Sequence, residues 1–390
     1  MKAYLDNGST TAVAKEVVEA MLPYFTEKFG HPVMLYSAGQ EAADAVERSQ
    51  KAIAGTIGAK PGEIVFTSGA TEANDIAIRG AAMARRARGK HIITTKIENP
   101  SVLRVCEVLE KDGFKVDYIP VDREGFVKLE DIEKAITDKT ILVSVANVND
   151  EIGTIQPIEE IGKILKERGR EILFHVNAAA GYGRVPIDVE KARIDLLSLS
   201  AHKIHGPKGV GALYIKERTS IQPTSHGYIS LFILKPGTEN VPGIVGFAKA
   251  AELAFDGFER HVGHMRKLQG RLMRGFEERV KYIQLHGPRG EKRSPANVNY
   301  SFKGVEGEAV QLHLSLNGVS VTTGSACSTR KLEPSHVMTA IGIRPEVAHG
   351  AIRFTLSRYN TEDEIDHTLD VVPRVIENLR KISPVKAEEL

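Results

Sequence analysis

The feature that most constrains this chain is a recurring order of a short apolar strand followed by a helical stretch. Runs rich in β-branched residues are typical of strands, and each is followed by a segment with helical spacing of apolar residues. The runs that fit this pattern are 64–67, 91–95, 116–119, 141–145 and 172–176. Apolar strands that alternate with helices predict a mostly parallel sheet with both faces covered. Such sheets bind ligands beyond the carboxyl ends of their strands, so the residues just after each run are candidate site residues.

Beyond residue 258 the order of elements changes. A long, strongly charged helix is expected over 262–280, and shorter strands are expected over 296–302 and 352–356. An amphipathic helix over 362–382 follows. This mixture predicts a second, smaller α+β unit.

The chain has 390 residues, which is enough for two domains. We expect a large domain over 15–258, and a small domain made by 1–14 and 259–390. The N-terminal strip, before a first helix expected over 15–28, would join the small domain. The predicted fold class is therefore α/β, with a mostly parallel central sheet in the large domain and a smaller α+β domain.

Composition excludes several classes of protein. The chain has 52 Lys and Arg against 50 Asp and Glu, a net charge of +2 that indicates neither a nucleic-acid nor a membrane partner. Its two cysteines, Cys106 and Cys327, exclude a disulfide framework and favour a reducing compartment. No apolar run approaches the ~20 residues of a membrane span. The first residues also lack the apolar core of a signal peptide, so we expect a cytoplasmic protein.

The run 67–72 (TSGATE) follows a predicted strand and leads into a predicted helix. Free backbone N–H groups and the positive end of the helix dipole form an anion site at such a junction. A plain helix N-cap would produce the same run. This motif by itself leaves both interpretations open.

The block 195–211 carries an apolar strand into Ser200, His202 and Lys203 and then into a glycine-rich loop. A lysine that leaves an apolar strand beside a histidine is expected to have a lowered pKa, and its amine can then form a Schiff base. The neighbouring hydroxyl and imidazole can bind a phosphate. A lysine after a strand is more often only a solvated strand end, so the rest of the chain has to decide.

Together, these motifs resemble cysteine desulfurases of the NifS/IscS type, which are fold-type-I transferases that depend on pyridoxal 5'-phosphate (PLP). The resemblance covers nearly the whole chain. It rests on six runs in family order: 6–11 (DNGSTT), 66–74 (FTSGATEAN), 151–158 (EIGTIQPI), 200–211 (SAHKIHGPKGVG), 237–246 (GTENVPGIVG) and 324–328 (GSACS). Each run is a weak signal, but six in the same order make a chance match implausible.

The resemblance implies a role for each matching residue. Lys203 would hold PLP as a Schiff base, and Thr238 would reach the cofactor phosphate of the partner subunit in a homodimer. Arg353 would bind the substrate carboxylate with its bidentate guanidinium, in a substrate site shared with Asn149. The other positions that would contact PLP are Ala70, Thr71, Asn99, Asp150, Asn177, Ser200 and His202.

The resemblance also separates the two cysteines. Cys327 matches the nucleophile that takes sulfur from L-cysteine as a persulfide, leaves L-alanine, and passes the sulfur on for iron–sulfur assembly with a scaffold protein. Its Gly, Ser and Thr neighbours favour an exposed thiol, although a passive loop thiol is the alternative. Cys106 lies on the apolar face of a predicted helix, where we expect an inert buried side chain.

Three departures from the family concern the cofactor ring. Asn177 stands where the family has an Asp that pairs with the ring nitrogen, and Ala180 replaces a Gln that bonds the ring hydroxyl. Asn99 replaces the His that stacks on the ring and shuttles protons. Asparagine supplies no counter-charge and does not titrate near neutral pH, so the electron sink is expected to be weaker.

Three further departures lie around the substrate. Asp150 replaces an Asn and adds negative charge near the place for a substrate carboxylate. The segment 227–236 is bulky and apolar where the family is small and polar, which predicts a reshaped or occluded site mouth. The segment 31–36 also departs from the family pattern.

Three hypotheses remain open from the sequence. The first is a cysteine desulfurase that acts through Lys203, Arg353 and Cys327. The second is a PLP enzyme of the same fold that acts on another amino acid, with the segment 227–236 forming its side-chain pocket. The third is a weakly active, dimeric scaffold that binds an iron–sulfur assembly partner.

Overall fold

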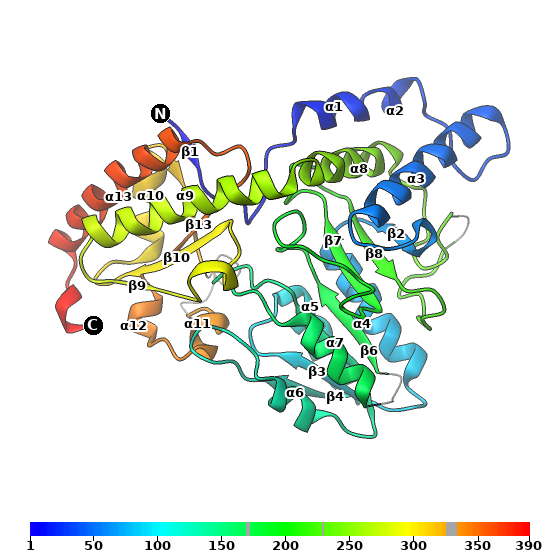
Figure 1. The fold of residues 1–390 in the computed structure, drawn as a ribbon, viewed down its shortest axis with the longest axis horizontal. Helices are drawn as coiled ribbons and strands as arrows, with labels where there is room; N and C mark the ends of the chain where they lie inside the picture. Colours follow the sequence, from blue (N-terminus) through cyan, green and yellow to red (C-terminus); the bar gives the residue numbers. More distant parts are fainter. Residues whose placement is uncertain (169–171, 228–229, 325–333) are drawn as a thin grey trace.

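The computed structural model describes residues 1–168, 172–227, 230–324 and 334–390. Figure 1 shows two groups of strands and helices, with the N-terminus beside elements from the C-terminal part of the chain. The strands are β1 (Ala3–Tyr4), β2 (Ile64–Thr67), β3 (His91–Thr95), β4 (Lys115–Ile119), β5 (Thr140–Ala146), β6 (Leu173–Asn177), β7 (Leu196–Ser200), β8 (Gly211–Ile215), β9 (Ile283–Leu285), β10 (Asn297–Phe302), β11 (Val319–Ser320), β12 (Thr322–Thr323) and β13 (Ala351–Thr355). The helices are α1 (Lys15–Met21), α2 (Pro23–Thr26), α3 (Ser37–Gly55), α4 (Ala70–Arg85), α5 (Pro100–Lys111), α6 (Leu129–Ala135), α7 (Ile158–Glu167), α8 (Val241–Phe255), α9 (Phe258–Arg279), α10 (Gly307–Leu316), α11 (His336–Ala340), α12 (Pro345–Ala348) and α13 (Glu362–Ile382).

The central sheet has the strand order β2-β8-β7-β6-β5-β3-β4. β8 runs antiparallel to its neighbours β2 and β7, whereas the strands from β7 to β4 pair in parallel. Because β2 is antiparallel to β8, it runs in the same direction as β7. The carboxyl ends of β2, β7, β6, β5 and β3 therefore share one edge of the sheet, where open α/β sheets bind ligands. The predicted mostly parallel α/β sheet is confirmed.

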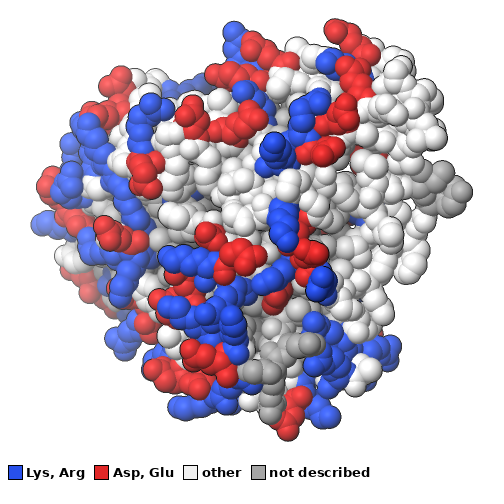
Figure 2. All heavy atoms as spheres, turned by 45° about the vertical axis from the view of Figure 1, so that its right-hand side comes forward, with Lys and Arg blue, Asp and Glu red and all other residues white. Residues whose placement is uncertain are grey.

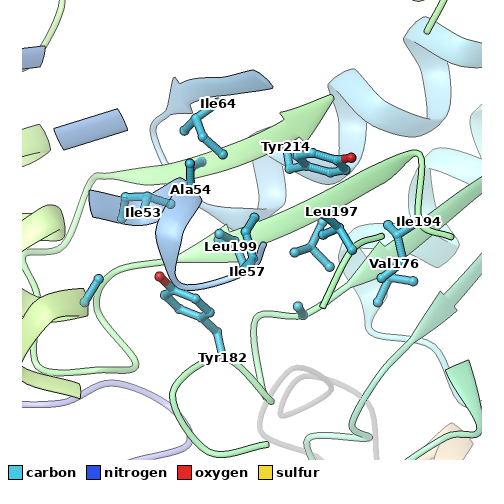
Figure 3. Packing of buried hydrophobic residues seen from close by; sticks show 14 of the residues in the cluster. Ile53, Ala54, Ile57, Ile64, Val176, Tyr182, Ile194, Leu197, Leu199 and Tyr214 are labelled. Carbon is cyan, nitrogen blue, oxygen red and sulfur yellow. The ribbon is translucent and has the colours of Figure 1, made fainter. Parts of the chain in front are cut away.

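Helices cover both faces of this sheet because the side chains of its strands alternate in direction. On β7, Leu197 and Leu199 join a buried cluster that includes Tyr182, and Figure 3 shows these side chains close to one another. Leu196 points to the other face and joins a cluster formed with α4 and α5. A fully buried leucine contributes roughly 1.5–3 kcal/mol. This two-sided burial holds in place the strand that ends just before Lys203.

The second sheet, β12-β13-β10-β9, is antiparallel and packs against α9. Its core holds edge-to-face aromatic contacts between Phe276 of α9 and Tyr300 and Phe302 of β10. The N-terminal strip is attached here, because Ala3 of β1 pairs with Val319 of β11. We therefore propose, as the sequence predicts, that 1–14 and 259–390 form the small domain and 15–258 the large one.

Two predicted helices differ from the observed ones at their ends. The helix expected over 262–280 begins earlier, at Phe258. The single helix expected over 15–28 is wrong: α1 ends at Met21, and α2 is a short turn that begins at Pro23 and ends at Thr26. Proline has no backbone N–H and cannot continue the hydrogen bonding of the preceding helix. Within the described ranges, no helix has the length and apolar character needed to cross a membrane.

Candidate active site

The carboxyl edge of the central sheet brings distant parts of the chain together. A cavity of about 580 Å³ lies there. The sequence-predicted residues that line it are Ala70, Thr71, Asn99, Asn177, Ser200, His202 and Lys203. A smaller cavity beside it is lined by Asn99, Asn149, Asp150, Asn177, Ala180 and Lys203, among others. The structure thus collects the predicted site residues of β2, β3, β5, β6 and β7 around Lys203.

The N-terminus of α4 and the end of β7 form a site for an anion. The helix begins at Ala70, one residue before the hydroxyl residue Thr71, and its N-cap is Gly69 with a φ of +154°. The Ser200 hydroxyl is buried and lines the large cavity, yet it has no hydrogen-bond partner among the described residues. A buried hydroxyl without a partner is costly. The site therefore fits a phosphate, which would accept hydrogen bonds from Ser200 and from the N–H groups of α4.

His202 adds a neutral donor to this site. Burial lowers its pKa to about 4, and the charge of Lys203 acts in the same direction, so its imidazole is neutral at pH 7. Its Nδ1 lies 3.2 Å from Oγ1 of Thr10. The Nε2 atom is therefore the ring nitrogen available to a phosphate oxygen in the cavity that His202 lines.

Lys203 is held in a setting that favours its neutral amine. Burial lowers its pKa; Asp150 raises it, and Arg353 and Arg184 lower it further. The net shift is downward, as expected from the sequence. A neutral amine is the form that attacks an aldehyde, so the geometry suits Schiff-base formation.

Arg184 is a positioning residue that sequence reasoning missed. It is buried, and its Nη2 donates hydrogen bonds to the carbonyl oxygens of Lys203 (3.0 Å) and Asn7 (3.1 Å). It thereby links the backbone of Lys203 to the N-terminal strip. The sequence offers no signal for this role, because a single arginine in a loop usually points into solvent.

The three neutral side chains that the sequence predicts around the cofactor ring, Asn177, Asn99 and Ala180, all line the smaller cavity. Oδ1 of Asn177 accepts a hydrogen bond from the backbone N–H of Ala179 (3.2 Å). Asn99 is the N-cap of α5, and its Oδ1 accepts from the backbone N–H (3.0 Å) and the hydroxyl (2.8 Å) of Ser101. Ala180 has no polar side-chain atom. None of the three can carry charge near neutral pH.

Arg353 comes from the second sheet, where it lies on β13. Its Nη2 donates to Oγ of Ser9 (3.0 Å) and lies 3.5 Å from Oδ1 of Asp6. Its Nη1 donates to the backbone carbonyl of Asp150 (3.0 Å). The buried Nε has no partner among the described residues. Arg353 can therefore still bind a carboxylate, but it does so in competition with two acidic side chains.

Asn149 lines the smaller cavity, although its amide is already engaged. Its Nδ2 donates to the carbonyl of Ile97 (2.8 Å), and its Oδ1 accepts from the backbone N–H groups of Glu151 (3.0 Å) and Ile152 (2.9 Å). These bonds shape the turn that carries Asp150. We propose that Asn149, predicted to contact substrate, acts by holding this turn.

Thr238 and the described residues of the segment 227–236 do not line either cavity. Oγ1 of Thr238 is 3.4 Å from Nε2 of His31. In the segment 227–236, Phe232 packs edge-on against Phe66 of β2. Cys327 lies outside the described residues.

Cys106 is confirmed as a buried thiol. It lies on α5, is fully buried and forms no disulfide. Burial raises its pKa to about 12, so it stays protonated at neutral pH. A protonated, inaccessible thiol is a poor nucleophile.

The buried Glu98, next to Asn99, should make the stability of the folded protein depend on pH. Its Oε1 accepts from the backbone N–H of Ala146 (2.5 Å), and burial raises its pKa from 4.5 to about 8. A raised pKa in the folded state means that its contribution to stability is complete below pH 4.5 and is lost as the pH rises through 8. In Glu98→Gln, which stays neutral, thermal unfolding should therefore shift less between pH 6 and pH 9 than in the wild type.

The control for this prediction is Glu130→Gln, which removes an exposed glutamate from α6. Its unfolding temperature should show the same pH dependence as that of the wild type. Equal pH dependence in Glu98→Gln and the wild type would contradict the assignment.

The chain matches a known family and named relatives over nearly its whole length. The family described as "Aminotransferase class-V" matches residues 3–368. The chain is 50% identical over 387 residues to "Cysteine desulfurase IscS" of Dictyoglomus turgidum, covering 99% of this chain and 98% of the relative. It is 48% identical over 386 residues to "Cysteine desulfurase IscS" of Methanosarcina thermophila, covering 99% of this chain and 95% of that protein.

Solved structures agree in fold. The structure of a "NifS-like protein" superposes with a TM-score of 0.91 at 39% identity, covering 97% of this chain and all of that chain. A structure described as "SspA in complex with cysteine" superposes with a TM-score of 0.80 at 34% identity, covering 92% of this chain and all of that chain.

Proposed function

This chain belongs to the class-V aminotransferase family and, within it, to the cysteine desulfurases, and we propose that it removes sulfur from L-cysteine with PLP as its cofactor. The observation that carries the proposal is that Lys203 and the unpartnered Ser200 hydroxyl line the same cavity, while Arg353 lies near enough to lower the pKa of Lys203. These groups supply an amine, a phosphate site and a carboxylate site, which are what an amino acid and PLP require together.

The residues present fit PLP. The N-terminus of α4, with Thr71, Ser200 and His202, would hold its phosphate, and Lys203 would join its aldehyde as a Schiff base. When bound, PLP supplies an electron sink that weakens the bonds at the α-carbon of an amino acid. Asn177 would face the ring with a neutral amide.

Arg353 would hold the substrate by its carboxylate. The Nε of Arg353 has no partner among the described residues, and its Nη2 donates a hydrogen bond to Ser9. These two N–H groups belong to one planar guanidinium, whose geometry suits a carboxylate. This contact would orient the cysteine in the site. The nearby Asp6 and Asp150 are expected to weaken it, since like charges repel the incoming carboxylate.

We place Cys327 as the sulfur acceptor. In the balanced reaction, the Cβ–S bond of L-cysteine breaks and a new S–S bond forms with Cys327. The products are L-alanine and a Cys327 persulfide, so no external oxidant is needed. The persulfide sulfur would then pass to an iron–sulfur scaffold protein. A chain with only two cysteines has no disulfide framework, which suits a reducing compartment. We therefore propose that the reaction takes place in the cytoplasm.

We propose that the protein acts as a homodimer, with Thr238 reaching the partner's phosphate site. Large apolar side chains between residues 18 and 36 are exposed, which favours a protein partner. These residues are Val18, Leu22, Phe25, Phe29, Leu35 and Tyr36. Figure 2 shows a broad surface with few charged side chains on the right-hand side of its view. Thr238 contacts His31, so it lies beside this apolar strip.

The proposed function is tested by incubating the PLP-loaded protein with L-cysteine and a thiol reductant. Sulfide and L-alanine should appear in equal amounts. Cys327→Ser should lower sulfide release by at least about a hundredfold, because a hydroxyl is a far weaker nucleophile toward sulfur than a thiolate.

The matched control is Cys106→Ala, which removes the other, buried cysteine. It should retain sulfide release. Unchanged sulfide release in Cys327→Ser, or no consumption of L-cysteine by the wild type, would contradict the proposal.

A further inference from the structure

Asp150 is an acidic side chain that the proposed mechanism does not use, although it lies in the centre of the site. It shares the smaller cavity with Lys203, Asn99 and Asn177. Its Oδ2 also lies 4.0 Å from Nη1 of Arg353. A carboxylate that lines the same cavity as the Schiff-base lysine can influence the proton on that lysine's nitrogen through its charge.

The carboxylate is held in one orientation. Oδ1 of Asn99 is taken up by Ser101, so the Nδ2 of Asn99 must face the other way, and it donates to Oδ2 of Asp150 (3.2 Å). Nη1 of Arg353 donates a hydrogen bond to the backbone carbonyl oxygen of Asp150 and so holds this part of the backbone in place. The asparagine at position 99 is therefore a donor that favours an ionised Asp150 and does not exchange a proton with it.

The charges around Asp150 keep it ionised. Burial raises its pKa, but Lys203, then Arg353, and the hydrogen bond from Asn99 outweigh burial, so the net pKa is lowered. Asp150 in turn raises the pKa of Lys203, whereas burial lowers it. The other titratable and charged groups that interact with this pair are Arg353, Arg184, Asp6, His202, Glu98 and Glu151.

Asp150 is better placed than the other acids to serve Lys203. Asp6 acts on Lys203 less than Asp150 does and is engaged by Ser9 and Arg353. Burial raises the pKa of Glu98 to about 8, so it is largely protonated at neutral pH. Asn177, which is expected to face the ring nitrogen, carries no charge.

We propose that Asp150 is the counter-charge of Lys203 in this protein and keeps the proton on Lys203 Nζ when that nitrogen is joined to the cofactor. The negative charge of the site thus acts on the Lys203 nitrogen rather than on the ring nitrogen, which Asn177 would face. A protonated nitrogen makes the carbon attached to it more open to attack by the substrate amine. Asp150 would thereby favour entry of the substrate even though the ring is left without a charged partner. This inference rests on the proposed binding of PLP to Lys203.

The test follows the visible absorbance of the PLP-loaded protein as a function of pH, since protonation of the Lys203 nitrogen changes the colour of the bound cofactor. Asp150→Asn keeps the shape of the side chain and removes its charge. The midpoint of the spectral change should fall by about one pH unit or more. Asp150→Glu keeps the charge and should stay closer to the wild type than Asp150→Asn does.

The matched control is Asp6→Asn, which removes an equal charge from the other side of Arg353. Its midpoint should move by less than half as much. An unchanged or raised midpoint in Asp150→Asn, or an equal shift in Asp6→Asn, would overturn the role of Asp150 and leave the proposed function intact. If the wild type shows no cofactor absorbance at any pH, the proposed function itself fails, and this inference fails with it.

Discussion

Replacing Lys203 by alanine is expected to abolish the visible absorbance of bound PLP and to lower sulfide release from L-cysteine by at least about a thousandfold. The lysine places an amine just beyond the end of β7, in the large cavity, and its lowered pKa makes that amine reactive. The phosphate site would survive, because Thr71, Ser200 and His202 do not depend on the lysine. We therefore expect Lys203→Ala to bind PLP weakly and without a covalent bond.

Mass spectrometry after reduction with borohydride measures this directly. The wild type should gain the mass of the reduced cofactor on the peptide that contains Lys203, and the variant should not. The matched control is Lys96→Ala, since Lys96 also follows a strand of the parallel sheet, β3, but is exposed. Cofactor found on another lysine in Lys203→Ala, with sulfide release retained, would contradict the assignment.

The position of Lys203 could be predicted from the sequence because the strand order does not matter for it. Apolar runs that alternate with helices require parallel strands, and parallel strands end at a common edge. The residues after 64–67 and 196–200 are therefore expected at that edge if both runs are parallel strands of one sheet. The resemblance to the family predicted that Asn177 and Asp150 lie near Lys203, and the structure has both in the smaller cavity with Lys203.

The contacts between side chains could not be predicted in this way. The hydrogen bond from Asn99 to Asp150 joins two residues 51 positions apart, and it depends on how the α5 N-cap orients the amide of Asn99. The sequence indicated only that Asn99 could not act as an acid or base. Similarly, Arg184 reaches the Lys203 carbonyl across 19 residues through a loop that has no periodic pattern. Local patterns determine which residues meet at the sheet edge, whereas tertiary packing determines how they pair.

The second large effect is expected from Asn177→Asp, which changes one amide into a carboxylate at the end of β6. Oδ1 of Asn177 accepts a hydrogen bond from the Ala179 N–H, and an aspartate oxygen can accept the same bond. The substitution is therefore close to isosteric. With PLP bound, the new charge would stabilise a proton on the ring nitrogen and strengthen the electron sink. We expect the rate of sulfide release at saturating L-cysteine to rise by about tenfold or more.

The same change should destabilise the protein in the absence of PLP, because position 177 is only 6% exposed and an unpaired carboxylate there is poorly solvated. Added PLP should therefore raise the unfolding temperature of Asn177→Asp more than that of the wild type, because the ring supplies the missing partner. Asn99→His alone is a less suitable test of the electron sink than Asn177→Asp. It removes the side-chain cap of α5, at a cost of roughly 0.5–2 kcal/mol, together with the hydrogen bond to Asp150. In the double variant with Asn177→Asp, the histidine should add a group that can transfer protons, but the protein should be less stable. If Asn177→Asp gains neither turnover nor extra stabilisation by PLP, the ring nitrogen does not face β6, and the weakness of the electron sink must be sought at Ala180 or Asp150 instead.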